Sequence, residues 1–248
     1  MTPSNNTGLG SSIYDWLFAQ SLENQGPVNP PALEKAPIVL NIGAGAQSNN
    51  NSFDYTADGQ RMIVFNHMEA GDVNNMKDIN GNETGISVTR VGEIGPGGGT
   101  SDVTAPVSAI FPSSSTQTSL YTFGGLIGKG SVMSFIFSGM DDESTYTIDV
   151  LGSVTTPLNI SSITQYTIVG ATTESEQIEI INNKNGLVTF EDMQSVNGQM
   201  TLIVTGLNGS LGYINGLRIT DTTQAPEPAS ILLLSVGGLA LLRRRAYV

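Results

Sequence analysis

Apolar and polar residues alternate along much of the chain between residues 37 and 220. In a β-strand successive side chains point to opposite faces, so this period of two places one face in a core and the other in water. The run Val132–Phe137 is more continuously apolar, and it predicts a central strand that is buried on both faces. The alternating runs predict these buried residues: Ile148, Val150, Leu202, Val204, Leu217 and Ile219.

Turn-forming residues separate these runs at short intervals. Asp-Gly and Asn-Gly pairs occur at residues 58–59, 80–81, 185–186 and 197–198. Such pairs favour tight turns because both residue types tolerate a positive φ. No pattern in this stretch predicts a long helix. Residues 36–221 are therefore predicted to form an all-β domain, a two-sheet antiparallel sandwich or jelly roll.

Both ends of the chain differ from this domain. Residues 1–35 are polar and rich in proline, which predicts a flexible, disordered lead-in. Their one short apolar stretch is interrupted by Asp15 and follows no basic region, so it does not resemble a secretory signal peptide. Residues 222–248 contain an almost wholly apolar stretch, residues 229–242, with prolines before it and arginines after it.

We expect residues 229–242 to form a short transmembrane helix. These fourteen residues would span about 21 Å as a helix, less than the roughly 30 Å of a hydrocarbon core. Three features still favour insertion over burial in a protein core. The stretch follows the last predicted strand, and Pro228 blocks helix continuation upstream. Arginine side chains then extend a short span and remain cytoplasmic, and here they are Arg243, Arg244 and Arg245.

The tail resembles a PEP-CTERM sorting signal over about residues 224–246, with Pro226-Glu227-Pro228, the apolar stretch and the arginines in that order. The resemblance implies export in a polysaccharide-producing Gram-negative bacterium and association with exopolysaccharide or the cell surface. It also implies recognition by an exosortase, a membrane-embedded cysteine transpeptidase. Pro226, Glu227 and Pro228 would be the recognition element, and the arginines the membrane stop. Proteins with this signal normally begin with a secretory signal peptide, which residues 1–35 do not show.

The predicted sandwich also resembles galactose-binding jelly-roll domains, which are often attached to such tails. This resemblance implies the fold and assigns no ligand, because one fold hosts many functions. The resembling stretches are residues 38–43, 72–75, 78–88, 119–121, 146–153, 166–170 and 212–219.

Charge and composition narrow the range of partners. The chain has a net charge of −12, and three of its ten basic residues are the arginines of the tail. The phosphate backbone of a nucleic acid would repel so acidic a body, so we expect no nucleic-acid partner. The sequence contains no cysteine, which excludes disulfides and thiolate zinc sites.

The sequence favours a non-enzymatic protein without catalytic residues. His67 is the only histidine, and neither a cysteine nor a G-x-S-x-G elbow accompanies it, so we expect it to be structural. Glycines near residues 43–48 and 123–131 do not fit the spacing of nucleotide-binding loops. A glycoside hydrolase that uses a carboxylate pair is an alternative, since such a pair is defined by distance in space. Residues 141–143, Asp-Asp-Glu, are expected to mark a turn.

No cofactor is predicted, and a structural calcium ion is the alternative. Oxygen-bearing side chains follow one another at alternate positions of one stretch: Asp72, Asn74, Asp78, Asn80 and Asn82. An EF-hand loop beginning at Asp78 fails, because Glu83 occupies its glycine position. Turn formation by Asn and Asp is the simpler explanation.

Three hypotheses follow. The first is a non-enzymatic surface or matrix protein, anchored in the membrane as a precursor and then located at the cell surface or in the extracellular matrix. The second is a carbohydrate-binding module, with Tyr55, Tyr121, Tyr166 and Tyr213 as candidate stacking residues. The third is the glycoside hydrolase. Exposed, coplanar aromatic rings would favour the second hypothesis, and two carboxylates in one cleft would favour the third.

Overall fold

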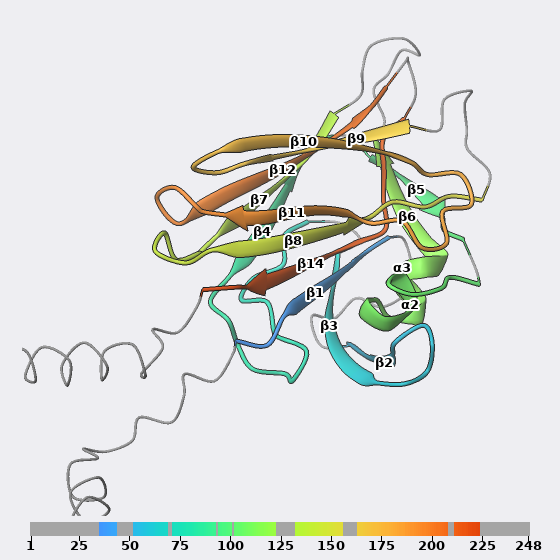
Figure 1. Cartoon of the computed structure of the whole chain (residues 1–248), viewed down its shortest axis with the longest axis horizontal. Helices are drawn as coiled ribbons and strands as arrows, with labels where there is room; N and C mark the ends of the chain where they lie inside the picture. Colours follow the sequence, from blue (N-terminus) through green and yellow to red (C-terminus); the bar gives the residue numbers. More distant parts are fainter. Residues whose placement is uncertain are drawn as a thin grey trace, which may run out of the picture. The chain divides into compact units, whose positions relative to one another are not determined.

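The computed structural model describes residues 35–43, 52–68, 71–92, 94–100, 102–122, 132–155, 163–207 and 211–223. Strands dominate these residues, and they form two large sheets and one small one (Figure 1). The predicted all-β sandwich is confirmed. The predicted lead-in, residues 1–35, lies almost wholly outside the described residues, and so does the predicted transmembrane helix, residues 229–242.

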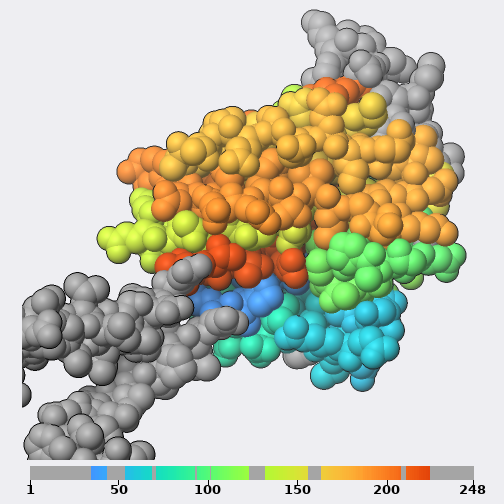
Figure 2. Space-filling view, viewed as in Figure 1, coloured from blue at the N-terminus to red at the C-terminus, as the bar shows by residue number. Residues whose placement is uncertain are grey.

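The first large sheet has six strands in the order β11-β8-β14-β1-β3-β2. Its neighbours are antiparallel except β1 and β3, which are parallel. Figure 2 shows that this order brings the end of the domain back to its beginning, with β14 between β8 and β1. The strands are β1 (Ile38–Ile42), β2 (Ser52–Tyr55), β3 (Met62–Met68), β8 (Tyr146–Leu151), β11 (Val188–Met193) and β14 (Gly216–Asp221).

The second large sheet has five strands in the order β10-β9-β12-β7-β4, and all of its neighbours are antiparallel. Its strands are β4 (Ser87–Val91), β7 (Val132–Ser138), β9 (Ile163–Val169), β10 (Thr173–Glu179) and β12 (Gln199–Gly206). A three-stranded sheet contains β13 (Tyr213–Ile214), β6 (Thr118–Thr122) and β5 (Ile94–Gly98). Two short helices precede β6, α2 (Val107–Ile110) and α3 (Ser113–Gln117).

The main core lies between the two large sheets. Inward side chains of both sheets, such as Leu40, Ile148, Phe135 and Leu202, pack there in one cluster. The six residues predicted to be buried are all 0–1 % exposed, which confirms the alternation as the signal of this core. Burial of each such side chain stabilises the fold by about 1.5–3 kcal/mol.

The prediction for residues Val132–Phe137 was wrong on one point. Strand β7 is internal, as expected, but it buries only one face: Met133, Phe135 and Phe137 face the core, while the residues between them stay partly exposed. An apolar residue such as Ile136 lies on the outer face of the five-stranded sheet. A run of apolar residues therefore does not distinguish a doubly buried strand from one whose outer face carries neutral residues.

The outer face of the six-stranded sheet is covered by the segment that holds α2. Val107 and Phe111 pack there on Val39, Phe65 and Leu151 in a second cluster. The Phe111 ring lies so close to Gly216 that a Cβ atom at that glycine would be 3.1 Å from it. Among the described residues, the six-stranded sheet thus carries a layer on its outer face and the five-stranded sheet does not.

Candidate functional site

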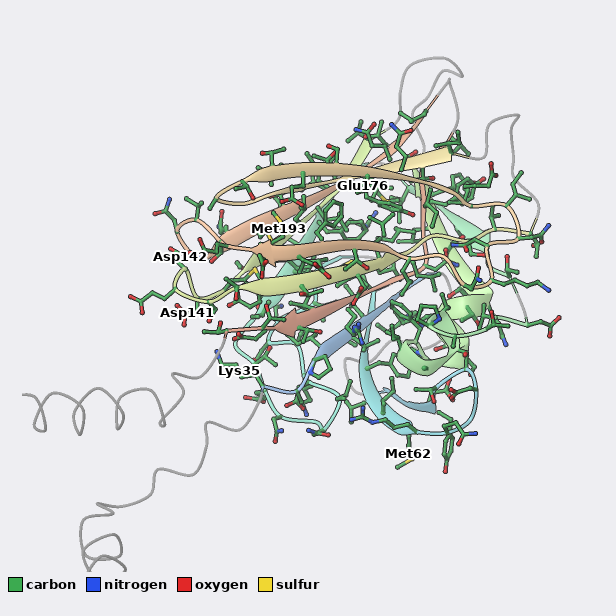
Figure 3. All side chains as sticks on the ribbon, viewed as in Figure 1. Lys35, Met62, Asp141, Asp142, Glu176 and Met193 are labelled. Carbon is green, nitrogen blue, oxygen red and sulfur yellow. The ribbon has the colours of Figure 1, made fainter. Side chains whose placement is uncertain are left out.

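The residues where the chain enters and leaves the sandwich lie at the same end of it. Strands β1 and β14 are antiparallel neighbours, with Ile38 opposite Ile219, so residue 35 and residue 223 come close together. The ammonium of Lys35 lies 2.7 Å from the Asp221 carboxylate. Figure 3 shows Lys35 at the same end as Asp141 and Asp142 of the turn between β7 and β8. We call this end, with residues 35–36, 139–145 and 219–223, the tail-bearing end.

Two threonines fasten the last described residues to the turn before β8. The backbone N–H of Thr222 donates to the carbonyl of Thr145 at 2.8 Å, and Thr145 in turn donates to the hydroxyl of Thr223 at 3.0 Å. These bonds continue the ladder between β14 and β8 beyond Asp221. The chain is therefore held up to Thr223, three residues before Pro226 of the predicted recognition element.

The ion pair of Lys35 and Asp221 shifts the pKa values of both groups. The hydrogen bond to Asp221 raises the pKa of Lys35, although partial burial opposes this. Burial raises the pKa of Asp221, but hydrogen bonds from Lys35 and Thr223 outweigh burial, and its pKa lies below the usual range. The Lys35 side chain is 67 % exposed, so water screens the pair and its contribution to stability is below about 1 kcal/mol.

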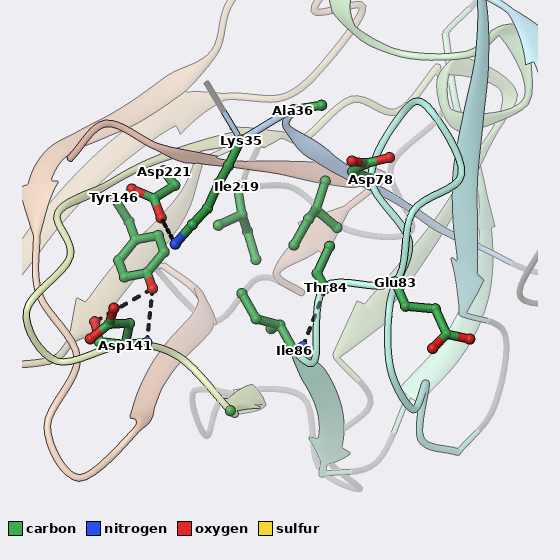
Figure 4. A pocket seen from close by; sticks show the side chains of 12 residues that line it. Lys35, Ala36, Asp78, Glu83, Thr84, Ile86, Asp141, Tyr146, Ile219 and Asp221 are labelled. Atoms are coloured by element: carbon green, nitrogen blue, oxygen red, sulfur yellow. Dashed lines mark hydrogen bonds and ion pairs between the residues drawn. The ribbon is translucent and has the colours of Figure 1, made fainter. Parts of the chain in front are cut away.

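A pocket of about 390 Å³ opens beside this ion pair (Figure 4). Ile38, Ile86 and Ile219 contribute apolar walls, and Tyr146 contributes its ring. Four carboxylates also line the pocket: Asp78, Glu83, Asp141 and Asp221. The hydrolase hypothesis requires two carboxylates in one cleft, and this pocket meets that requirement. The hydrogen-bond partners of the carboxylates then distinguish a catalytic role from a structural one.

Three of these four carboxylates, those of Asp78, Asp141 and Asp221, accept hydrogen bonds from nearby backbone N–H groups. Both oxygens of Asp78 accept hydrogen bonds, from the backbone N–H groups of Asn80 and Asn82 and from the Asn82 amide, at 2.8–2.9 Å. Asp141 accepts the backbone N–H of Glu143 at 3.0 Å, as expected for a turn. A glycosidase needs one carboxyl group with a raised pKa as its general acid, whereas the pKa of Asp221 is lowered. These partners favour a structural role for those three acids.

Three of the five residues weighed as calcium ligands, Asp78, Asn80 and Asn82, form one turn. Asp78 serves the turn just described, while Asp72 and Asn74 are exposed in the preceding segment. Among the described residues no group of three or more acidic or histidine side chains is arranged to hold a metal ion. The structure thus gives Asp78, Asn80 and Asn82 a role in one turn that needs no cation.

His67 lies within the six-stranded sheet. It is 7 % exposed on β3, and its Nδ1 atom lies 3.1 Å from the amide nitrogen of Asn41, the residue opposite it on β1. A structural role for this histidine stays a prediction.

Of the four tyrosines considered for stacking on sugars, two cannot take part. Tyr166 and Tyr213 are at most 1 % exposed, and the Tyr166 hydroxyl donates to the carbonyl of Tyr213. Tyr121 is half-buried, with its ring 5.6 Å from that of Tyr213. Tyr55 is 55 % exposed on β2 of the six-stranded sheet, whereas the other three tyrosines belong to the other two sheets. The described tyrosines therefore form no common stacking surface.

The residues of the predicted sorting signal lie outside the described residues: Pro226, Glu227, Pro228, Arg243, Arg244 and Arg245. Within the described ranges, no helix has the length and apolar character needed to cross a membrane. What the structure adds is the geometry of the site where the tail begins. Sequence patterns did not reveal this geometry, because the Lys35–Asp221 pair joins residues 186 positions apart.

The fold and the tail together define a β-sandwich protein that carries a C-terminal sorting tail. Residues 224–246 match the family described as "PEP-CTERM protein-sorting motif", which confirms the predicted tail and marks the chain as an exported, sorted protein. No curated protein matches the chain. Among solved structures, TmCBM61 in complex with beta-1,4-galactotriose is similar at 10 % identity and a TM-score of 0.33, over 54 % of this chain and 88 % of that one. A TM-score this low carries no argument about a ligand.

Proposed function

We propose that this chain is a non-enzymatic protein that its tail anchors in the membrane, and that an exosortase then releases it to the cell surface or extracellular matrix. There the sandwich associates with exopolysaccharide. The observation that carries the proposal is the position of the sorting motif directly after the last strand. Thr223 is bonded to the sandwich, and the motif begins at residue 224.

This short connection sets the distance between the sandwich and the membrane. Five residues, 224–228, separate Thr223 from the apolar stretch that begins at Ala229. Fully extended, five residues reach at most about 18 Å. Before release, the tail-bearing end would lie close to the membrane surface, and the recognition element would be next to the membrane-embedded transpeptidase.

Membrane fractionation tests the anchoring half of this proposal. In a host without the transpeptidase, the full chain should sediment with membranes, while a version that ends at Thr223 should stay in the supernatant. That version keeps all of β14 and the threonine bonds to Thr145, so both proteins retain the same sandwich contacts. Equal solubility of the two proteins would contradict anchoring by the tail.

A further inference from the structure

The outer face of the five-stranded sheet carries neutral side chains across its full width. One row across the sheet, read from β10 to β4, is Ser175, Thr167, Ile203, Ser134 and Val91. The row contains three hydroxyl residues and two aliphatic ones. We call the outward side of β10, β9, β12, β7 and β4 the neutral face. Among its outward residues the one charged side chain in the described strands is Glu179, at the end of β10.

The charged residues of these strands point the other way. Glu176 is opposite Tyr166, and Arg90 is opposite Phe135, and both of these partners belong to the core. Glu176 is seen on β10 at the upper edge of the molecule in Figure 3. Acidic side chains are mostly exposed in folded proteins, yet this exposed face of a chain with a net charge of −12 carries only Glu179 among the described strands.

Polar groups of the neutral face hold one another in place. The hydroxyls of Thr167 and Ser175 lie 2.7 Å apart, and the amide of Gln177 donates to that of Gln165 at 3.2 Å. The outward residues of the described strands all remain partly or fully exposed, so no described segment covers the face. Figure 1 shows this sheet on the side of the sandwich away from α2 and α3. The face is therefore ordered and accessible.

We propose that the neutral face binds an uncharged glycan chain. Hydroxyl and amide groups exchange hydrogen bonds with sugar hydroxyls, and the methyl groups of Ile203 and Ile136 pack against sugar C–H groups. An anionic polymer would be repelled by the net charge of the protein and by the glutamates of β10 at the edge of the face. An uncharged glycan is not repelled by the net charge of the protein. At the centre of the neutral face it also lies away from the glutamates of β10.

The size of the face favours a polymer chain over a second copy of the protein. Five strands about 4.8 Å apart, with outward residues about 6.6 Å apart along each strand, give a face of roughly 500 Å². A stable protein interface buries about 800 Å² on each partner. A single glycan chain needs less area, and repeated units along one polymer allow many copies of the protein to bind in parallel.

This inference deepens the proposed association with exopolysaccharide and rests on it. The test uses the full chain in a zwitterionic detergent without sugar groups, and measures its retention on immobilised galactan, mannan, dextran, β-glucan and polygalacturonate. We expect retention on at least one of the four neutral polymers and none on polygalacturonate. Retention on no neutral polymer, or preference for polygalacturonate, would overturn the proposal while leaving sorting, which fractionation judges, unaffected.

Variants locate the binding surface. Thr201→Arg places a long charged side chain on central strand β12 and should lower retention about tenfold or more. Thr89→Arg should have the same effect from edge strand β4, where an arginine disturbs the fold less. Thr147→Arg is the matched control on the six-stranded sheet. An equal loss in the control would overturn the assignment. A second result would also overturn it: the wild-type chain sediments as a dimer, and Thr201→Arg or Thr89→Arg abolishes that dimer. The neutral face would then bind a second copy of the protein.

Discussion

The guanidinium of Arg218 lies against the carboxylate of Asp149, with 2.6 Å between Nη2 and Oδ2. The two residues are opposite each other on β14 and β8. Thr189 of β11 donates a further hydrogen bond to the same carboxylate, at 2.7 Å. The Asp149 side chain is 5 % exposed, so these two partners, and not water, stabilise its negative charge. The Asp149 carboxylate thus joins three adjacent strands, through one ion pair and one hydrogen bond.

Removal of the arginine from this pair should destabilise the fold strongly. Arg218→Met leaves the buried Asp149 carboxylate without its cation, and we expect a loss of about 2–4 kcal/mol in the free energy of unfolding. Urea unfolding of the full chain in detergent measures it. Lys35→Met, which removes an exposed partner, is the control and should cost below about 1 kcal/mol. Similar losses in both variants would contradict the assigned burial.

The side chain of Asn215 joins three segments and should be equally sensitive. Its amide donates to the carbonyl of Thr118 and its oxygen accepts the N–H of Ser153, both at 2.7 Å. Asn215→Ala removes the partner of the buried Ser153 N–H and of the part-buried Thr118 carbonyl, at a cost of about 2–4 kcal/mol. Thermal unfolding measures the effect against exposed Asn74→Ala, expected to be near neutral. A melting temperature unchanged by Asn215→Ala would show that water replaces these bonds.

The Lys35–Asp221 pair predicts a stability difference that depends on pH. The pKa of Asp221 is lowered in the fold, so its contribution is present above the unfolded value near 4 and is lost as pH falls through the folded value. The pKa of Lys35 is raised, so its contribution is present below about 10.4 and is lost as pH rises through the folded value.

The difference in unfolding free energy between the wild-type chain and Asp221→Asn should therefore be flat from about pH 5 to 9 and shrink on either side. Urea unfolding at a series of pH values measures it. A difference that persists unchanged at pH 2 would mean that the carboxylate acts by its shape and not by its charge.

Processing of the tail should depend on Glu227. In a host that has an exosortase, Glu227→Ala should make the uncleaved precursor accumulate in membranes, because the charged centre of the predicted recognition element is lost. Immunoblots of membrane and surface fractions measure the ratio of the two forms. Glu143→Ala, an exposed acid at the tail-bearing end, is the matched control and should be processed normally. Normal processing of Glu227→Ala would contradict the assigned recognition element.

Local sequence patterns predicted the strands, but they did not predict which strands pair with one another. Alternation identified buried residues such as Leu202 because the period of a strand is local. It failed at Val132–Phe137, where Ile136 is as apolar as its buried neighbours but faces outward. The sorting tail was predicted from its resemblance to PEP-CTERM signals, which rests on the order of Pro-Glu-Pro, apolar stretch and arginines. The Lys35–Asp221 pair and the neutral face depend on which strands are neighbours, and a single sequence does not state this.

Strand β14 also determines how the protein bears mechanical load. A force on the tail pulls β14 along its own axis, from its place between β8 and β1. The residue pairs on both sides of β14 would then be loaded together in shear. They run from Gly216–Leu151 to Asp221–Tyr146 along β8, and from Asn41 to Ile38 along β1. Hydrogen bonds loaded in this way must break almost simultaneously, whereas bonds at a peeled edge strand break one after another. If the tail holds the sandwich while a polymer pulls on the five-stranded sheet, β14 would therefore be the last strand to detach.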